Sequence, residues 1–162
     1  MGKYGFSAQN YATTTALRTV ILLSAGTTLG RSAEIIEVIM TGGRGSGPQD
    51  IMHDAVGNFC TMATTGTAGS APVAVPLDPL NGNASKTGAA GAQIAFTAEP
   101  SVYDTVNPLL YGFNQRGGMR FSVPQGEGMK IFSQATGKMA FGMQVISSVA
   151  GNVNANYMYW EP

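Results

Sequence analysis

Residues able to do chemistry are few in this 162-residue chain, and His53 is its only histidine. Asp50 and Asp54 lie close to it in sequence, so a turn could bring a carboxylate beside the imidazole ring. One imidazole and two loop carboxylates are a poor ligand set for zinc or another transition metal. We therefore expect no metal site and no cofactor, and we interpret His53 as an ordinary surface residue.

The residues needed for nucleophilic or acid–base catalysis are also few. Cys60, the single cysteine, stands among apolar residues in an expected strand, where a buried structural thiol is the usual outcome. Its only imidazole partner would be His53, with no second acid placed to orient that base. Carboxylates that could form a glycosidase pair are Glu34, Glu37, Glu99, Asp104 and Glu127. We read them as scattered surface acids and expect no catalytic residues, no small-molecule substrate and no enzyme.

The elements expected to carry these residues are strands. Short apolar segments bounded by Gly, Pro, Asn and Ser, without long helical periodicity, are typical of an all-β sandwich or barrel. Met119–Val123, Met129–Gln134 and Met139–Ser147 are predicted to pair as a three-stranded meander. The other predicted strands are Lys3–Ala8, Arg18–Ser24, Ala33–Thr41, Asn58–Ala63, Ala92–Ala98, Leu109–Asn114 and Tyr157–Trp160. A short helix is expected near Asp104–Leu110.

Two long loops rich in Gly, Pro, Thr and Ala complete the predicted fold, Gly42–Asp50 and Thr64–Gly91. Within the second, the prolines of Pro72–Leu80 favour an extended backbone. Loops of that length are usually functional or ordered by a neighbour. We expect one domain over residues 1–162, with residues 1–15 as an N-terminal arm or edge strand and residues 64–91 as a long extended loop.

Charge is the feature that points most directly to function. Asp, Glu, Lys and Arg make up 11% of the chain, against about a quarter in ordinary soluble domains. Tyr4–Leu17 and Met139–Trp160 contain no charged residue, and Ala55–Ser85 contains only Asp78. Because charges keep soluble monomers apart, their scarcity predicts a surface covered by other copies or by another protein.

The same numbers disfavour two other partners. The net charge is zero, so the chain has no excess of Lys and Arg with which to bind a polyanion. We therefore expect no nucleic-acid binding. No apolar run reaches the roughly 18 residues of a membrane span, and we expect no membrane partner.

Aromatic residues gather at both ends of the chain, which indicates termini held in the sheet or on a neighbour. Strand alternation puts Tyr157 and Tyr159 on one side and Trp160 on the other, so core and contact roles both stay open. Arg44, on a glycine-rich loop, could reach an acidic patch of a partner. The contact residues that we expect are Lys3, Tyr4, Phe6, Tyr11, Arg44, Val75, Leu77, Leu80, Tyr157, Tyr159 and Trp160.

The order of several features resembles a known group of proteins. The Gly43–Asp50 loop is followed by a Thr/Ala/Gly tract, the Pro76–Pro79 segment, an aromatic strand at Leu110–Phe113 and the ending Tyr159–Pro162. This order resembles small capsid decoration, or cement, proteins of tailed bacteriophages. The resemblance implies a jelly-roll-like β-sandwich that forms trimers on the capsid exterior and braces neighbouring major capsid proteins.

The resulting hypothesis is a non-enzymatic virion structural protein, assembled in the host cytoplasm. It would form a homo-oligomer, expected to be a trimer, and bind the major capsid protein through its termini and long loops. One alternative is a phage head-fibre or tail-tip β-sandwich that binds a host glycan or receptor. Another is a self-assembling jelly-roll capsid protein.

Overall fold

The structure of the chain is a computed structural model. It describes residues 2–25, 30–44, 50–62, 67–78, 83, 85, 91–100, 103–104, 107–134 and 137–162. Strands account for nearly all of the regular structure in these ranges. They are β1 (Gly2–Thr13), β2 (Arg18–Ser24), β3 (Ser32–Gly42), β4 (Met52–Met62), β5 (Thr67–Ser70), β6 (Val75–Pro76), β7 (Ala92–Ala98), β8 (Leu109–Asn114), β9 (Gly118–Ser122), β10 (Met129–Gln134), β11 (Gly137–Ser147) and β12 (Gly151–Glu161).

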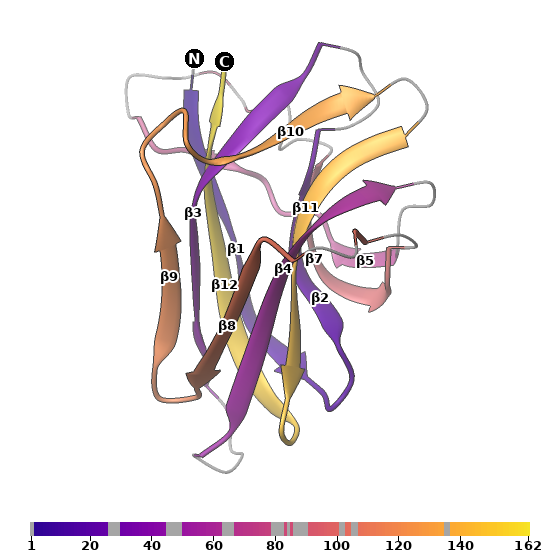
Figure 1. The fold of residues 1–162 in the computed structure, drawn as a ribbon, viewed down its shortest axis with the longest axis vertical. Helices are drawn as coiled ribbons and strands as arrows, with labels where there is room; N and C mark the ends of the chain where they lie inside the picture. The colour runs from indigo at the N-terminus through magenta and orange to yellow at the C-terminus, as the bar shows by residue number, and fades with distance from the viewer. Residues whose placement is uncertain are drawn as a thin grey trace.

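The strands form two antiparallel sheets packed together, so the prediction of an all-β sandwich is confirmed (Figure 1). Sheet A has the order β6-β1-β12-β3, and both β9 and β10 lie on the far side of β3. Sheet B has the order β5-β7-β2-β11-β4-β8. β10 connects the sheets, because its first residues pair with β3 and its last two pair with β11.

The pairing of the long strands is nested. β1 pairs with β12 and β2 pairs with β11. β3 pairs with β9 and β10, and β4 pairs with β8. β1, β2 and β3 thus meet their counterparts counted from the other end, β12, β11 and β10, whereas β4 pairs with β8 and β5 with β7. In Figure 1 the indigo β1 and the yellow β12 run side by side, and both termini lie at the same end of the sandwich.

The predicted three-stranded meander is partly wrong. β10 does pair with β11, but β9 pairs with β3 instead of with β10. β9 and β10 follow each other along one edge of β3, facing residues 37–41 and then 32–35. They act as one long edge strand that is interrupted by a turn at residues 123–128. The cause is Pro124 together with Gly126 and Gly128, which favour a turn in the middle of this run.

The core between the sheets contains interlocking aromatic rings. Tyr4 stacks on Tyr159 with ring centroids 5.7 Å apart, and Phe6 meets Tyr157 edge-on at 5.6 Å. Tyr157 also reaches sheet B, where its hydroxyl donates a hydrogen bond to the carbonyl of Phe141 at 3.3 Å. Burial raises the pKa of the Tyr157 and Tyr159 hydroxyls. The aromatic ends of the chain are therefore tied down in the sheet.

Most strand predictions are confirmed and two other predictions need correction. Ala33–Thr41 is a strand within β3, and Arg18–Ser24, Ala92–Ala98 and Leu109–Asn114 match the observed bounds. The helix expected near Asp104–Leu110 is wrong at its end, since Leu109 and Leu110 begin β8. Residues 105 and 106 lie outside the described ranges.

The long loop expected at Thr64–Gly91 is not wholly a loop. It contains β5, which pairs with β7, and β6, which pairs with β1. The extended backbone expected around the prolines agrees with β6. The remaining parts of this loop, 64–66, 79–82, 84 and 86–90, and residues 45–49 of the Gly42–Asp50 loop lie outside the described residues.

Candidate functional site

His53 is buried, so the expectation of a surface histidine is wrong. Its side chain is 0% exposed and packs against the Phe113 ring at 5.1 Å. A 2.6 Å hydrogen bond joins its Nδ1 atom to the hydroxyl of Ser147. Burial lowers the pKa of His53, because the charged imidazolium would lose its hydration. The residue is a structural part of the core.

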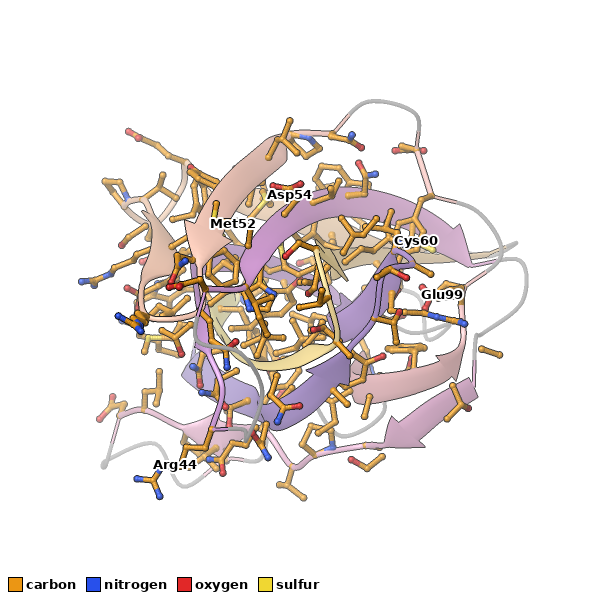
Figure 2. The ribbon with its side chains drawn as sticks, turned by 90° about the horizontal axis from the view of Figure 1, so that it is seen from below. Arg44, Met52, Asp54, Cys60 and Glu99 are labelled. Atoms are coloured by element: carbon orange, nitrogen blue, oxygen red, sulfur yellow. The ribbon has the colours of Figure 1, made fainter. Side chains whose placement is uncertain are left out.

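The residues expected near His53 do not build a site with it. Asp54 is exposed on β4, and Asp50 is exposed with Arg116 at 4.0 Å. Cys60 is buried, as predicted for a structural thiol. Figure 2 shows Cys60 and Glu99 on one side of the view, apart from Asp54 and far from Arg44. Among the described residues, no three His, Cys, Asp or Glu side chains gather as a metal-binding group.

Two of the candidate glycosidase carboxylates, Glu34 and Glu37, accept hydrogen bonds that hold the fold together. Glu37 accepts a hydrogen bond from Arg120 Nε at 2.5 Å. Glu34 Oε1 accepts the backbone N–H groups of Gly126 and Gly128, both at 2.7 Å. Glu99 lies elsewhere, on sheet B. Asp104 and Glu127 are exposed.

Glu99 is the centre of a polar network that sequence reasoning missed. It accepts the backbone N–H of Thr19, at 3.0 Å and 3.1 Å to its two oxygens, and also the Thr19 hydroxyl. The Thr19 hydroxyl in turn bonds to the Tyr103 hydroxyl at 2.7 Å. Burial raises the pKa of Tyr103. Thr19 lies 80 positions from Glu99 and 84 from Tyr103 along the chain, so no local pattern could have predicted the network.

Four of the expected contact residues belong to the core instead. Tyr4, Phe6, Tyr157 and Tyr159 are all buried between the sheets, where they pack on one another. We correct their assignment from contact residues to core residues of the protomer. Alternation along β12 decided this outcome, since Tyr157 and Tyr159 point inward while Met158 and Trp160 point outward.

Most of the other expected contact residues lie at or near the surface of the protomer. Lys3 and Trp160 face one another across β1 and β12 on the outer face of sheet A. Val75 and Leu77 are exposed beside β1, and Arg44 is exposed and projects from the ribbon in Figure 2. Leu80 lies outside the described residues.

Tyr11 is half-buried, and its hydroxyl donates to the carbonyl of Phe96 at 3.3 Å. Burial and the nearby charge of Glu99 raise the pKa of this phenol. The residue therefore connects β1 to β7, and its hydroxyl is already used within the protomer.

Parts of the charge-poor segments meet in sheet A as β6, β1 and β12, whereas the rest form β4, β5 and β11 of sheet B. β1 carries Lys3 as its only charge, β12 carries only the buried Glu161, and β6 carries none. β12, β1 and β6 are consecutive neighbours in sheet A. We call the solvent-facing side of β1, β12, β3 and β10 the sheet A outer face. Three hollows lie along it.

Two of the hollows differ in chemistry. The apolar groove has a volume of about 300 Å3 and lies between β12, β1 and the 72–77 segment, with Val73, Val75, Leu77 and Met158 in its lining. Leu77 holds this segment to β1 through a 2.8 Å hydrogen bond from its N–H to the carbonyl of Lys3. Val73 is 82% exposed.

The polar groove, of about 490 Å3, lies at the other end of the face. Gln9, Asn10, Thr41, Arg44, Asn154 and Asn156 line it. Asn10 has a left-handed backbone (φ 53°) where β1 bulges against β12, and its N–H donates to Asn154 Oδ1 at 2.8 Å. Asn154 also donates to the carbonyl of Gly42 at 3.2 Å, so the groove wall is fixed by hydrogen bonds.

The third hollow lies over β12, β3 and β10 and includes Trp160 and Phe132. Sequence reasoning named Trp160 but missed Glu34, Lys130 and Phe132 as its neighbours. Only the register of three strands brings them together, and alternation within single strands carries no such information.

Comparisons with known proteins add no identification. No protein-family model matches the chain, and no curated protein matches its sequence. Within the described residues, no helix is long and apolar enough to cross a bilayer.

Proposed function

We propose that this chain is a non-enzymatic structural protein of a virion, which binds the outer capsid surface and stabilises contacts between major capsid proteins. The observation that carries the proposal is that the neighbouring strands β6, β1 and β12 together carry only Lys3 and the buried Glu161. Removing charges from water is costly, so a face with few charges can be covered by a partner at low desolvation cost. Such a face suits a protein whose task is contact.

We also propose the finer fold class, a jelly roll. Nested pairing of β1 with β12, β2 with β11 and β3 with β10 is what a long hairpin rolled into two sheets would produce. Jelly rolls consist of two Greek keys in a double sheet and are found in viral capsid and lectin domains. This agreement supports the proposed class.

The docking surface would be the apolar groove together with the adjoining edge of β1. Within the described residues, β6 pairs only with Tyr4 and Gly5 of β1. An incompletely covered edge and exposed apolar side chains such as Val73 are features that monomeric proteins usually avoid. On a capsid both would be covered by the major capsid protein or by a second copy of this chain. Three linked copies would strengthen weak individual contacts through avidity.

Capsid binding is tested with shells assembled from the major capsid protein of the encoding phage, mixed with the purified chain and sedimented. Val73→Asp and Val75→Asp place a charge on the apolar groove and should reduce co-sedimentation at least tenfold. The matched control is Leu110→Asp, because Leu110 is 67% exposed on β8 of the opposite sheet. Equal binding by all three variants would reject this docking surface, and no binding by the unaltered chain would reject the capsid role.

The oligomeric state is a separate part of the proposal. Light scattering should give three times the mass of the 16.8 kDa chain. A stable monomer would contradict the trimer. Closed shells formed by this chain without any other shell protein would favour the self-assembling capsid alternative instead.

The second candidate, a head-fibre or tail-tip module, is favoured by one observation. The half-exposed Phe132 and the half-buried Trp160 line a hollow away from the apolar groove. A receptor-binding module needs such a site, whereas capsid binding does not.

A further inference from the structure

The hollow at one end of the sheet A outer face is built by a row of side chains across four strands. Lys3 lies opposite Trp160, Trp160 opposite Glu34, and Glu34 opposite Lys130. Side chains directly opposite on neighbouring strands have their Cβ atoms about 5 Å apart. The hollow has a volume of about 180 Å3, and its lining includes Ser32, Glu34, Gln125, Lys130, Phe132 and Trp160.

Two aromatic rings form the walls of this hollow. Phe132 is 50% exposed and Trp160 is half-buried. At protein interfaces, aromatic anchors usually fill a pocket of the partner. Here the rings line a concave space instead, so an occupant must enter between them. The walls therefore fit a small group better than a flat protein surface.

Glu34 gives the hollow a fixed acceptor. Its Oε1 atom is held by the backbone N–H groups of Gly126 and Gly128 at 2.7 Å each. These bonds also hold the turn that carries Gln125, in which Gly126 has a left-handed backbone (φ 100°). The second carboxylate oxygen makes no hydrogen bond to the described residues. It is thus placed in advance to accept one from a ligand.

The remaining polar groups are mixed in kind. Lys130 and the indole N–H of Trp160 can donate, the Ser32 hydroxyl and the Gln125 amide can do both, and none of these side chains has a hydrogen bond within the described part of the chain. The volume is below the roughly 300–1,000 Å3 of sites for drug-sized molecules. The hollow therefore suits one ring that carries several hydroxyl groups.

We propose that this hollow binds a pyranose unit of a glycan, with the Trp160 ring as the stacking platform and Glu34 as the main acceptor. The face of an aromatic ring is electron-rich, so it attracts the weakly positive C–H groups on the flat side of a sugar. The hydroxyl groups at the rim of the sugar then meet Glu34, Gln125 and Ser32. The proposal of this sugar site does not depend on whether the chain binds a capsid.

Trp160 is the only tryptophan in the chain, so its fluorescence reports on this hollow alone. The purified full chain is first screened on an array of neutral, N-acetylated and uronic-acid glycans. The strongest ligand is then titrated as a free oligosaccharide. We expect a saturable change in emission, because the sugar displaces water from the indole ring.

Three variants separate the site from general effects on folding. Trp160→Ala and Phe132→Ala should each weaken binding about tenfold or more, since each removes a stacking wall. Glu34→Gln keeps the oxygen that Gly126 and Gly128 need but loses the charge and one acceptor, and it should weaken binding at least about fivefold. Leu110→Ala on the opposite sheet is the matched control and should bind normally.

The proposal is overturned if no glycan on the array binds. It is also overturned if a glycan binds equally well to Phe132→Ala and Glu34→Gln, which change an exposed and a half-buried position outside the core. A Trp160 emission change that follows self-association or capsid addition, with no glycan present, would assign the hollow to a protein contact. Loss of capsid binding with intact glycan binding, or the reverse, distinguishes this site from the proposed docking groove.

Discussion

The outer faces of the two sheets differ in how far other segments of the chain cover them. On sheet B, the segment containing Glu99 and Tyr103 lies over part of the face and builds a second small core with Leu22, Cys60, Phe96 and Ala140. On sheet A, the corresponding face has no such cover among the described residues, and three hollows lie along it. The chain itself thus covers part of the sheet B face, which we call the closed face, although Met52 and Leu110 stay exposed there. The sheet A outer face is the open face. In a protein with so few charges, the open face is where a partner can contribute.

Gly142→Val should have the largest effect, because it breaks the closed face. A Cβ atom at Gly142 would lie 2.7 Å from the Tyr103 hydroxyl, which is too close for any real contact. Displacing this ring should lower the free energy of unfolding by about 2–3 kcal/mol. Urea denaturation measures this change in the free energy of unfolding. Gly112→Val on β8 is the matched control, since its Cβ would meet only the Asp54 side chain at 3.3 Å.

Glu99→Ala should have the next largest effect on the closed face. It leaves the Thr19 N–H and hydroxyl without their acceptor, and the loss should be about 2 kcal/mol, as for a hydrogen bond to a charged group. Glu127→Ala in an exposed turn should change stability by less than about 0.5 kcal/mol. Similar losses for the two variants, measured by thermal denaturation, would show that the network does not hold this segment.

Mild acid should weaken sheet B through His53, with a smaller effect. Burial lowers the pKa of this imidazole in the folded chain, so the unfolded chain takes up the proton first as pH falls. Stability should be complete above about pH 6.5 and decline below it. The melting temperature of the chain should fall between pH 7.5 and pH 5.5. His53→Gln should make that decline shallower, and an unchanged slope would contradict the role of His53.

Val73→Ser should have the smallest effect on stability. It tests whether the 72–77 segment, beside the sheet A outer face, contributes to the fold. Val73 is 82% exposed, so the unfolding free energy should change by less than about 0.5 kcal/mol. Val38→Ser, at a fully buried position of β3, serves as the sensitive comparison and should cost several times more. A large loss for Val73→Ser would mean that the 72–77 segment is part of the fold and not a free contact surface.

Strand positions and side-chain alternation could be predicted from the sequence because they depend on local residue types. The inward direction of Tyr157 and Tyr159 is an example. His53 was missed because β4 was expected to begin only at Asn58. Once β4 is extended to Met52, the same alternation places His53 inside and Asp54 outside.

Neighbour relations between strands could not be predicted in this way. The row of Lys3, Trp160, Glu34 and Lys130 depends on which strands pair and in which register, and both are set by contacts far apart in sequence. The Glu99 network has the same origin. The candidate site was therefore only partly accessible from the sequence, through its aromatic residues and its lack of charge.

The nested pairing also has a consequence for the order in which the chain can fold during synthesis. β5 and β7 form the innermost pair and have both emerged by Ala98, whereas β1 must wait for β12. Pairings between distant segments are slow to form, and unpaired strands are prone to aggregate. Until β12 arrives, β1 presents Tyr4 and Phe6 to water with both of its edges short of partners. Synthesis of β12 is thus the step on which closure of sheet A depends, because β12 lies between β1 and β3.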